Sequence, residues 1–440
     1  MLKNTYKTEV KISRLFSTLG LAAVCLFPFN YASAFEVGIH SHFRRYSQPS
    51  DYYLQEIRDL GFNSFRSDYL WEGMEEKKGV LEVSPSLRRE DAAFNNGEKY
   101  GLSALAVLAY GNRQYDPSGY PTTPEAIKAY ANYAYWSASR LKGKVKYYEV
   151  WNEWVNGTGI QTRPLKVPPP QVFVELVKQA SIAIKRADPN AIVVAGSISP
   201  FSKRDMDWFN QVLSLGVLKY LDGVSIHPYS YKDGNYKLRS AEGNLAGIDA
   251  FETKLSKLAG HSVPIYITEN GIPTYTGDGG LSGDEVAQYV IKYTLLAKTR
   301  SYIKGVWWYD LIDDGKSDHV NEDRFGFYAQ GGKPKPAAGY YQKIADIAKN
   351  YQVQQYKVDN NGIVNITLKS PEGMYALLRW QEIIPQKASM IDRGLSKLKS
   401  SGAASSAGDV MLIESKDSTA AVRNDGVPLL IRSTEPIKLQ

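Results

Sequence analysis

Strand-like and helix-like stretches alternate along the chain from Phe35 to about Tyr351. Continuous apolar runs of strand length, such as residues 102–109 and 191–195, are each followed by a segment with helical signals. Those signals include Pro124 directly after Thr123 and a capping-box sequence that begins at Ser282. Eight such units predict a parallel (β/α)8 barrel over residues 35–351, because strands buried on both faces need helices around them.

The pattern changes after residue 351. Short strand-like segments at residues 363–368, 374–380, 409–413 and 428–431 are separated by turn sequences such as Asn424-Asp425-Gly426. They predict a small all-β domain over residues 352–440, with a sandwich-like arrangement. We expect this domain to brace the barrel, since a sandwich of this size buries little apolar area alone.

Residues 1–34 have the composition of a secretory signal peptide. Four basic residues flank or precede the apolar stretch Leu15–Phe29, and Ala32-Ser33-Ala34 is a small-residue cleavage pattern. The apolar stretch is shorter than the roughly 20 residues that usually cross a bilayer. We therefore expect export to the periplasm or beyond. The single cysteine, Cys25, lies in this segment, so the mature chain is expected to lack disulfides and thiolate chemistry.

Charge and motifs narrow the function classes. The net charge is +7, and removing the signal peptide, with its four basic residues and one acidic residue, lowers it by three. No run of Lys and Arg is typical of nucleic-acid binding. No glycine-rich phosphate loop or nucleophile-elbow serine follows a strand, which disfavours nucleotide chemistry and serine hydrolysis. No His/Asp cluster has convincing metal-ligand spacing, so we expect neither a metal nor a cofactor.

Two of the predicted strands end in a glutamate. Glu153 follows the apolar and aromatic stretch Tyr147–Trp151, and Glu269 ends the stretch Val263–Thr268. An unpaired carboxylate at a buried strand end is costly, whereas at the mouth of a barrel it faces a ligand. Two carboxyl groups can protonate a glycosidic oxygen and stabilise the positive charge that develops on the sugar. The pair therefore predicts a two-carboxylate active site.

The sequences Trp151-Asn152-Glu153 and Ile267-Thr268-Glu269-Asn270-Gly271, in this order on a barrel pattern, resemble the clan A glycoside hydrolases. The resemblance covers about residues 35–351. Size, signal peptide and C-terminal β domain are most similar to the family 39 endoglycosidases of the Psl type, which are encoded with exopolysaccharide biosynthesis machinery. The resemblance to clan A implies a retaining enzyme with Glu153 as acid/base and Glu269 as nucleophile. Glu153 should then be protonated at rest, because the charge of Glu269 disfavours a second negative charge nearby.

The resemblance also implies roles for four helpers. Arg66, at the end of the second strand, is the candidate that holds Glu269 ionised, and a salt bridge at the rim is the alternative. Asn152 matches the asparagine that binds the sugar 2-hydroxyl, with a simple turn residue as the alternative. His227-Pro228-Tyr229 resembles the clan's His-x-Tyr pattern, in which His lines the subsite and the Tyr hydroxyl approaches the nucleophile. Packing at a strand end is the alternative for that motif.

Further candidates for the sugar-binding wall come from other strand ends. The clan places an aromatic floor at the last strand, and Trp307 and Trp308 point in opposite directions there. We favour Trp308, because Trp307 sits deeper in the strand. His40 and His42 after the first strand are candidates, with solvated or core histidines as the alternative. Asn112 is a possible donor at the rim after the third strand.

The sequence predicts a hydrolase that cleaves internal bonds of an extracellular or periplasmic polysaccharide. Two alternatives remain: an exo-acting β-glycosidase such as a β-xylosidase, and a non-catalytic carbohydrate-binding component of a polysaccharide secretion complex. We expect a monomer that binds a polysaccharide or oligosaccharide and no nucleic acid. Association with the inner membrane or with secretion machinery is a further candidate interaction.

Overall fold

Eight parallel strands close into a barrel in a computed structural model that describes residues 35–385, 412–415 and 420–437. The strands follow chain order around the barrel, and β1 pairs with both β2 and β8. They are β1 (Glu36–His40), β2 (Ser64–Leu70), β3 (Ser103–Ala109), β4 (Tyr147–Val150), β5 (Ile192–Ile198), β6 (Gly223–Ile226), β7 (Ile265–Asn270) and β8 (Ile303–Trp308). The (β/α)8 barrel predicted from the sequence is confirmed.

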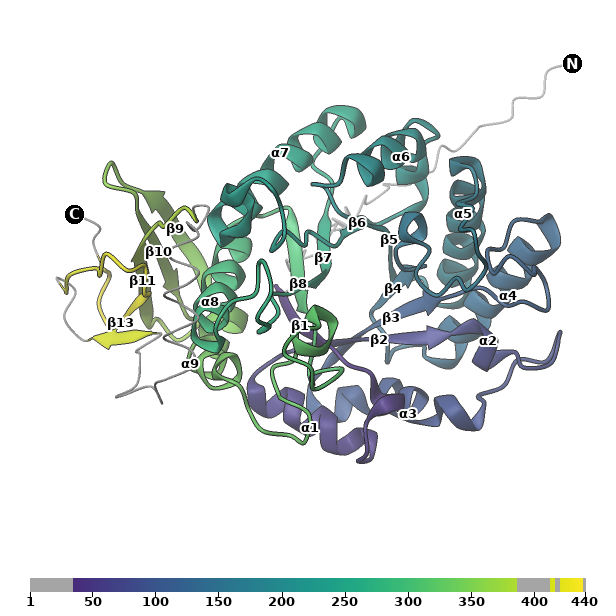
Figure 1. The fold of residues 1–440 in the computed structure, drawn as a ribbon, viewed down its shortest axis with the longest axis horizontal. Coiled ribbons are helices and arrows are strands. Elements are labelled where there is room, and N and C mark those ends of the chain that lie inside the picture. The colour runs from purple at the N-terminus through teal and green to yellow at the C-terminus, as the bar shows by residue number, and fades with distance from the viewer. Residues whose placement is uncertain (1–34, 386–411, 416–419, 438–440) are drawn as a thin grey trace, which may run out of the picture. The chain divides into compact units, whose positions relative to one another are not determined.

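Helices lie around the outside of the strands (Figure 1). Those in the described residues are α1 (Ser50–Leu60), α2 (Trp71–Met74), α3 (Arg88–Asn96), α4 (Pro124–Arg140), α5 (Pro170–Ala187), α6 (Lys203–Ser214), α7 (Ala241–Ala259), α8 (Gly283–Lys298) and α9 (Pro336–Asn350). Their ends follow local signals. The Thr123 hydroxyl accepts from the Ala126 amide at 3.1 Å, and Ser282 and Glu285 form the expected capping box. None of these helices is both long and apolar enough to cross a membrane.

The lower part of the barrel interior is filled by aromatic side chains. Trp307 is fully buried and packs against Tyr147 and Tyr266, and its indole N–H donates to the Ser64 hydroxyl at 2.9 Å. The Trp307 ring fits because Gly38 on β1 has no side chain, since a Cβ there would overlap the ring. This aromatic layer closes the barrel beneath the strand ends.

A five-stranded sheet follows the barrel and confirms the small all-β domain. Its strands are β9 (Gln352–Val358), β10 (Ile363–Lys369), β11 (Tyr375–Gln381), β12 (Ile413–Ser415) and β13 (Leu429–Ser433), in the order β12-β13-β11-β10-β9. In the described residues this is one sheet and not the two facing sheets of the expected sandwich. The expected strand at 409–413 lies partly, and the signal peptide at 1–34 wholly, outside the described residues.

One face of this sheet joins the core of the barrel, which removes the need for a second sheet. Ile366 and Leu378 belong to the same buried cluster as the barrel's helices and strands. The Trp380 indole N–H donates to Glu242 on α7 at 2.6 Å, and Arg432 donates to the backbone oxygen of Lys343 on α9 at 2.9 Å. Barrel and sheet belong to one compact unit.

Gly38→Ala tests the packing of the barrel interior. We expect a loss of about 1–3 kcal/mol of stability, because the added methyl group displaces the Trp307 ring. The measurement is the midpoint of chemical unfolding. Gly339→Ala is the matched control, since Gly339 lies within α9 and a Cβ there meets nothing within 4 Å. It should stabilise the protein by about 0.5–1 kcal/mol, and equal effects of the two changes would contradict the packing.

Candidate active site

Glu153 and Glu269 meet at the carboxyl-terminal end of the barrel. One carboxylate oxygen of Glu153 and one of Glu269 lie within 4.8 Å of each other. Both side chains line a cavity of about 530 Å³. The cavity is also lined by five other residues that the sequence analysis singled out: His40, His42, Arg66, Asn152 and Tyr229. Residues from five strands and the loops that follow them thus converge on one space; Arg66, expected at the end of its strand, is the third residue of β2.

The segment that carries Glu153 has an unusual backbone. Trp151 and Glu153 have φ values of 68° and 48°, in the left-handed region that non-glycine residues enter at a cost of roughly 1–2 kcal/mol each. Packing holds them there: the buried Trp151 ring stacks on Tyr120 and meets the Trp154 ring edge to face at 4.8 Å. The aromatic cluster therefore fixes where the carboxyl group of Glu153 points.

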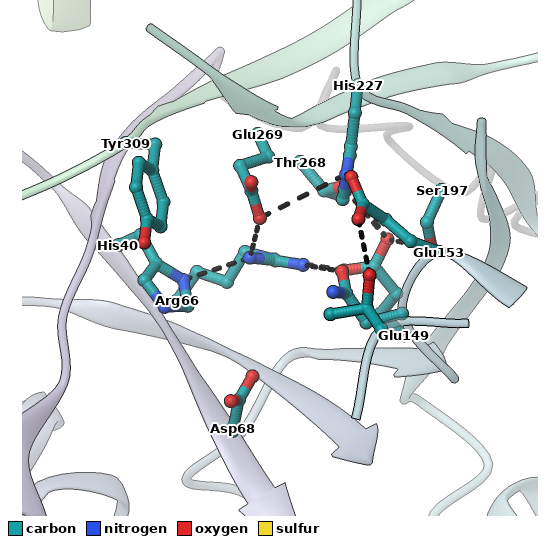
Figure 2. Close-up of polar contacts among 12 residues, drawn as sticks. His40, Arg66, Asp68, Glu149, Glu153, Ser197, His227, Thr268, Glu269 and Tyr309 are labelled. Carbon is teal, nitrogen blue, oxygen red and sulfur yellow. Dashed lines mark hydrogen bonds and ion pairs between the residues drawn. The ribbon is translucent and has the colours of Figure 1, made fainter. Parts of the chain in front are cut away.

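Arg66 is the centre of the site's hydrogen bonds (Figure 2). Its guanidinium is 1% exposed. Nε donates to Glu149 at 3.0 Å, Nη1 donates to Glu269 at 2.7 Å, and Nη2 donates to Asn152 at 2.8 Å. Nη1 also lies 2.9 Å from His40 Nδ1, which must accept because guanidinium has no acceptor. One cation thus orients Glu269, Asn152 and His40 together.

Glu149 is a buried carboxylate below Glu153 and Glu269. Burial opposes its charge, but Arg66 and His227 lower its pKa below the ordinary value. Burial likewise opposes the charge of Arg66, whose pKa is nevertheless raised by the charges of Glu149 and Glu269. Glu149 and Arg66 therefore form an ion pair inside the barrel. From the sequence, Glu149 is only one residue of the predicted strand before Glu153, with no expected role.

Tyr229 and His227, from the loop after β6, reach the two glutamates separately. The Tyr229 hydroxyl donates to Glu269 Oε1 at 2.9 Å. His227 Nδ1 lies 3.2 Å from Glu153 Oε1, and its Nε2 lies 3.1 Å from the Thr268 hydroxyl. His227 therefore contacts the expected acid/base, and Tyr229 the expected nucleophile.

The contacts of Glu153 do not favour the resting protonated state expected from the sequence. Burial raises its pKa, but hydrogen bonds from His227, from the Thr158 hydroxyl at 2.7 Å and from Asn156 lower it overall to about 2. The expectation considered only the negative charge of Glu269. His227 and Thr158 lie closer to Glu153 and act in the opposite direction.

Neither tryptophan of β8 lines the cavity, so the expectation for Trp308 is wrong. Trp308 faces outward, where its ring meets Tyr293 of α8 at 5.5 Å and its N–H donates to Thr294 at 3.3 Å. Trp307 fills the barrel below. Tyr309 lines the cavity instead, because it lies two residues beyond Trp307 and so faces the same way.

Asn112 is also not a cavity residue. It is 2% exposed, and its amide donates to the backbone oxygen of Glu75 at 2.8 Å while its oxygen accepts from the Gln114 amide. These contacts brace the loop after β3. Tyr110, directly after β3, lines the cavity instead, and its hydroxyl oxygen accepts from Asn152 Nδ2 at 3.2 Å.

His40 and His42 form the wall beside Tyr309. Their rings meet edge to face at 4.5 Å, and the His42 ring lies 5.9 Å from that of Tyr309. Burial lowers the pKa of each well below its ordinary value, and nearby positive charges act in the same direction. Both histidines are therefore neutral and suited to hydrogen bonding.

In the part of the chain that the structure describes, two clusters have the composition of a metal site. Glu153, His227 and Glu269 form one, and His42, Asp310 and Asp314 form the other. In the second, Asp314 already accepts from Arg45 and from the Tyr309 hydroxyl. Burial and the charges of Asp314 and Asp313 raise the pKa of Asp310 well above its ordinary value, which favours its neutral form. Protein donors thus satisfy Asp314, whereas both oxygens of the buried Asp310 have no hydrogen-bond partner among the described residues.

Comparison with known proteins agrees with this geometry. The model of the cellulase family (glycosyl hydrolase family 5) matches residues 30–310. No curated protein sequence matches the chain. A similar solved structure is a family 39 glycoside hydrolase from the gut symbiont Bacteroides cellulosilyticus WH2, with 22% identity and a TM-score of 0.63. The match covers 82% of this chain and 74% of that one.

Two further solved structures share the fold at lower identity. The exo-beta-1,4-mannosidase Op5Man5 from Opitutaceae bacterium strain TAV5 has 16% identity and a TM-score of 0.54, over 72% of this chain and 60% of that one. Xylanase 10B from Thermotoga petrophila RKU-1 has 16% identity and a TM-score of 0.51, over 72% of this chain and 95% of that one. The family match covers well over half of this chain, so the chain belongs to glycosyl hydrolase family 5, a clan A family of glycoside hydrolases.

Proposed function

We propose that this protein is a retaining glycoside hydrolase that cleaves internal glycosidic bonds of an exported polysaccharide. The observation that carries the proposal is the separation of Glu153 and Glu269, whose nearest carboxylate oxygens lie within 4.8 Å. Retaining enzymes hold their two carboxyl groups about 5–5.5 Å apart, whereas inverting enzymes need about 6.5–9.5 Å to admit a water molecule. The short gap supports a double displacement.

In the first step, a Glu269 oxygen forms a bond to the anomeric carbon while the bond from that carbon to the leaving oxygen breaks. A proton from the acid group at Glu153 passes to the leaving oxygen. Water then attacks the glycosyl–enzyme ester and returns a proton to Glu153 as the bond to Glu269 breaks. Arg66 and Tyr229, which donate to separate oxygens of Glu269, orient the nucleophile for attack.

Asn152 and Tyr309 are proposed to hold the reacting sugar. Asn152 is fixed by Arg66 and Tyr110, and we assign it the sugar 2-hydroxyl. Tyr309 presents a ring in the cavity and is anchored through its hydroxyl to Asp314 at 2.9 Å. A rigid aromatic ring suits the C–H-rich face of a sugar.

The substrate and its location are proposed from the sequence. The composition of residues 1–34 supports export, and the resemblance to Psl-type family 39 endoglycosidases supports an exopolysaccharide. Exo action is the second candidate, because one structural neighbour is named an exo-beta-1,4-mannosidase. Size analysis of products from a long polymer distinguishes the two. Early products of intermediate length support internal cleavage, and steady release of one small sugar contradicts it.

Removing either carboxyl group should abolish most of the activity. Glu153→Gln and Glu269→Gln are each expected to lower kcat/KM by about 10²- to 10⁴-fold or more, because each loses one half of the acid and nucleophile chemistry. Release of new reducing ends from a panel of purified polysaccharides measures this. Glu372→Gln, on an exposed turn of the C-terminal sheet, is the control. Near-normal turnover by either active-site variant would falsify the assignment.

The stereochemistry of the product is a separate prediction. The first sugar released should have the same anomeric configuration as the substrate, because two displacements restore it. Proton NMR of the products, recorded before mutarotation, measures the configuration. An inverted anomeric configuration would contradict the double displacement and leave the glycosidase assignment unaffected.

Tyr309→Ala should weaken catalysis through lost contact with the sugar. We expect kcat/KM to fall about 10- to 100-fold, which corresponds to the loss of one buried aromatic contact. Trp308→Phe is the control, because Trp308 is the neighbouring residue at the end of β8 and packs on its outer face. It should lower the unfolding temperature and leave KM unchanged. A raised KM for Trp308→Phe with unchanged kcat/KM for Tyr309→Ala would mean that Trp308, and not Tyr309, contacts the sugar.

A further inference from the structure

A chain of hydrogen bonds leads from Glu153 into the barrel through His227. His227 Nδ1 lies 3.2 Å from Glu153 Oε1, and Nε2 lies 3.1 Å from the Thr268 hydroxyl oxygen. The Thr268 hydroxyl donates to Glu149 Oε1 at 2.8 Å. In Figure 2, His227 points from the top of the view toward Glu153 and Glu149 below it, and Arg66 lies to their left. His227 and Glu149 are 2% and 0% exposed, so solvent does not interrupt the chain.

Which atoms donate and which accept in this series of hydrogen bonds follows from counting protons. Glu149 is ionised beside Arg66, so it can only accept. A hydroxyl has one hydrogen, and Thr268 donates it to Glu149. The Thr268 oxygen must then accept from His227, so Nε2 carries a proton. Nδ1 is left facing Glu153 Oε1, and a hydrogen bond between them needs one proton on one of the two atoms.

We propose that the proton Glu153 delivers to the leaving oxygen is shared with His227 Nδ1, and that Glu149, acting through Thr268, is the positioning residue that holds His227 in the state that shares it. This inference rests on the proposed function of Glu153. The pair gives up one proton as the glycosidic bond breaks: the Nδ1–H bond breaks, an Oε1–H bond forms, and the acid proton passes to the leaving oxygen. Water returns one proton in the second step.

The charges around His227 favour this arrangement. Those that face it are Glu153, Glu149 at 3.9 Å, Glu269 at 4.0 Å, Arg66 and the neutral His40. Burial and Arg66 lower the pKa of His227, but the charge of Glu269, the hydrogen bond to Glu153 and the charge of Glu149 raise it overall. A protonated His227 also explains why the pKa of Glu153 is low: the acid proton rests mainly on the histidine.

The proposal has a consequence for the dependence of activity on pH. Because the pKa of His227 is raised above its ordinary value, the pair keeps its proton below that pKa and loses it as the pH rises through it. The alkaline side of the kcat/KM profile should therefore report the pair. Without the charge of Glu149, the same loss should occur at lower pH.

Nitrogen-15 NMR of the histidine side chains tests the proton's position directly. The chain has five histidines, so the His227 signals can be assigned by comparison with a His227→Gln protein. We expect Nε2 to stay protonated across the titration and Nδ1 to lose its proton with a pKa above about 6.5. Glu153→Gln should lower that pKa. A His227 that is neutral from pH 5 upward, or that loses its Nε2 proton, overturns the proposal.

Kinetics of two threonine variants test the role of Glu149 through Thr268. Thr268→Val removes the hydroxyl with little change in shape and should move the alkaline side of the profile to lower pH by about one unit. Thr268→Ser keeps the hydroxyl and should restore it. The probes are 4-nitrophenyl β-D-glucoside, β-D-mannoside and β-D-xyloside. A uniform fall in kcat at every pH, with no shift, would mean a merely structural role and overturns the proposal.

Glu149→Gln is the direct variant, with the same expected shift of the alkaline side and a lower His227 pKa by NMR. Because this change removes one of the two carboxylates that pair with the buried Arg66, the threonine pair decides the question if the protein does not fold. The two proposals fail in different ways. A wild-type protein that turns over no polysaccharide and none of the three probes refutes the proposed function, whereas the NMR titration still decides whether His227 holds the proton.

Discussion

The ion pair between Arg66 and Glu149 is the interaction on which the active end of the barrel depends. Both groups are almost completely buried, and burial of each ion costs several kcal/mol. That cost is offset because the guanidinium donates from Nε, Nη1 and Nη2 to four different residues. The same bonds that make the pair tolerable fix the orientation of Glu269, Asn152 and His40. The same hydrogen bonds therefore stabilise the interior of the barrel and align the residues of the site.

The barrel interior is layered so that this pair stays dry. On the side away from the cavity, the rings of Tyr147, Tyr266 and Trp307 pack against one another inside the barrel. On the other side lies the cavity, which Arg66 lines together with Glu153 and Glu269. An electrostatic interaction is far stronger in such a setting than in water, so small displacements of charge there have large effects.

The features that the sequence revealed were local and periodic. The barrel follows from repeated strand–helix units, and Glu153, Glu269 and Arg66 could be placed because each ends a predicted strand. The misassigned Trp308 shows where this approach stops: the direction of a side chain depends on the register of β8 against β1, where Trp307 pairs with Gly38. Residue alternation from Trp307 would have pointed to Tyr309. Glu149 and Thr268 gave no signal, since their role arises from contacts between distant strands.

The charge on this cluster is conserved through the proposed reaction. At rest it holds two cations, Arg66 and His227, and three carboxylates, Glu149, Glu153 and Glu269. When Glu269 becomes an ester it loses one negative charge, and at the same moment the His227–Glu153 pair gives its proton to the leaving oxygen and becomes one charge more negative. The second step reverses both changes. The net charge around Arg66 and Glu149 is therefore unchanged even while Glu269, the second carboxylate paired with Arg66, is an ester, which helps the buried ion pair to remain in place during turnover.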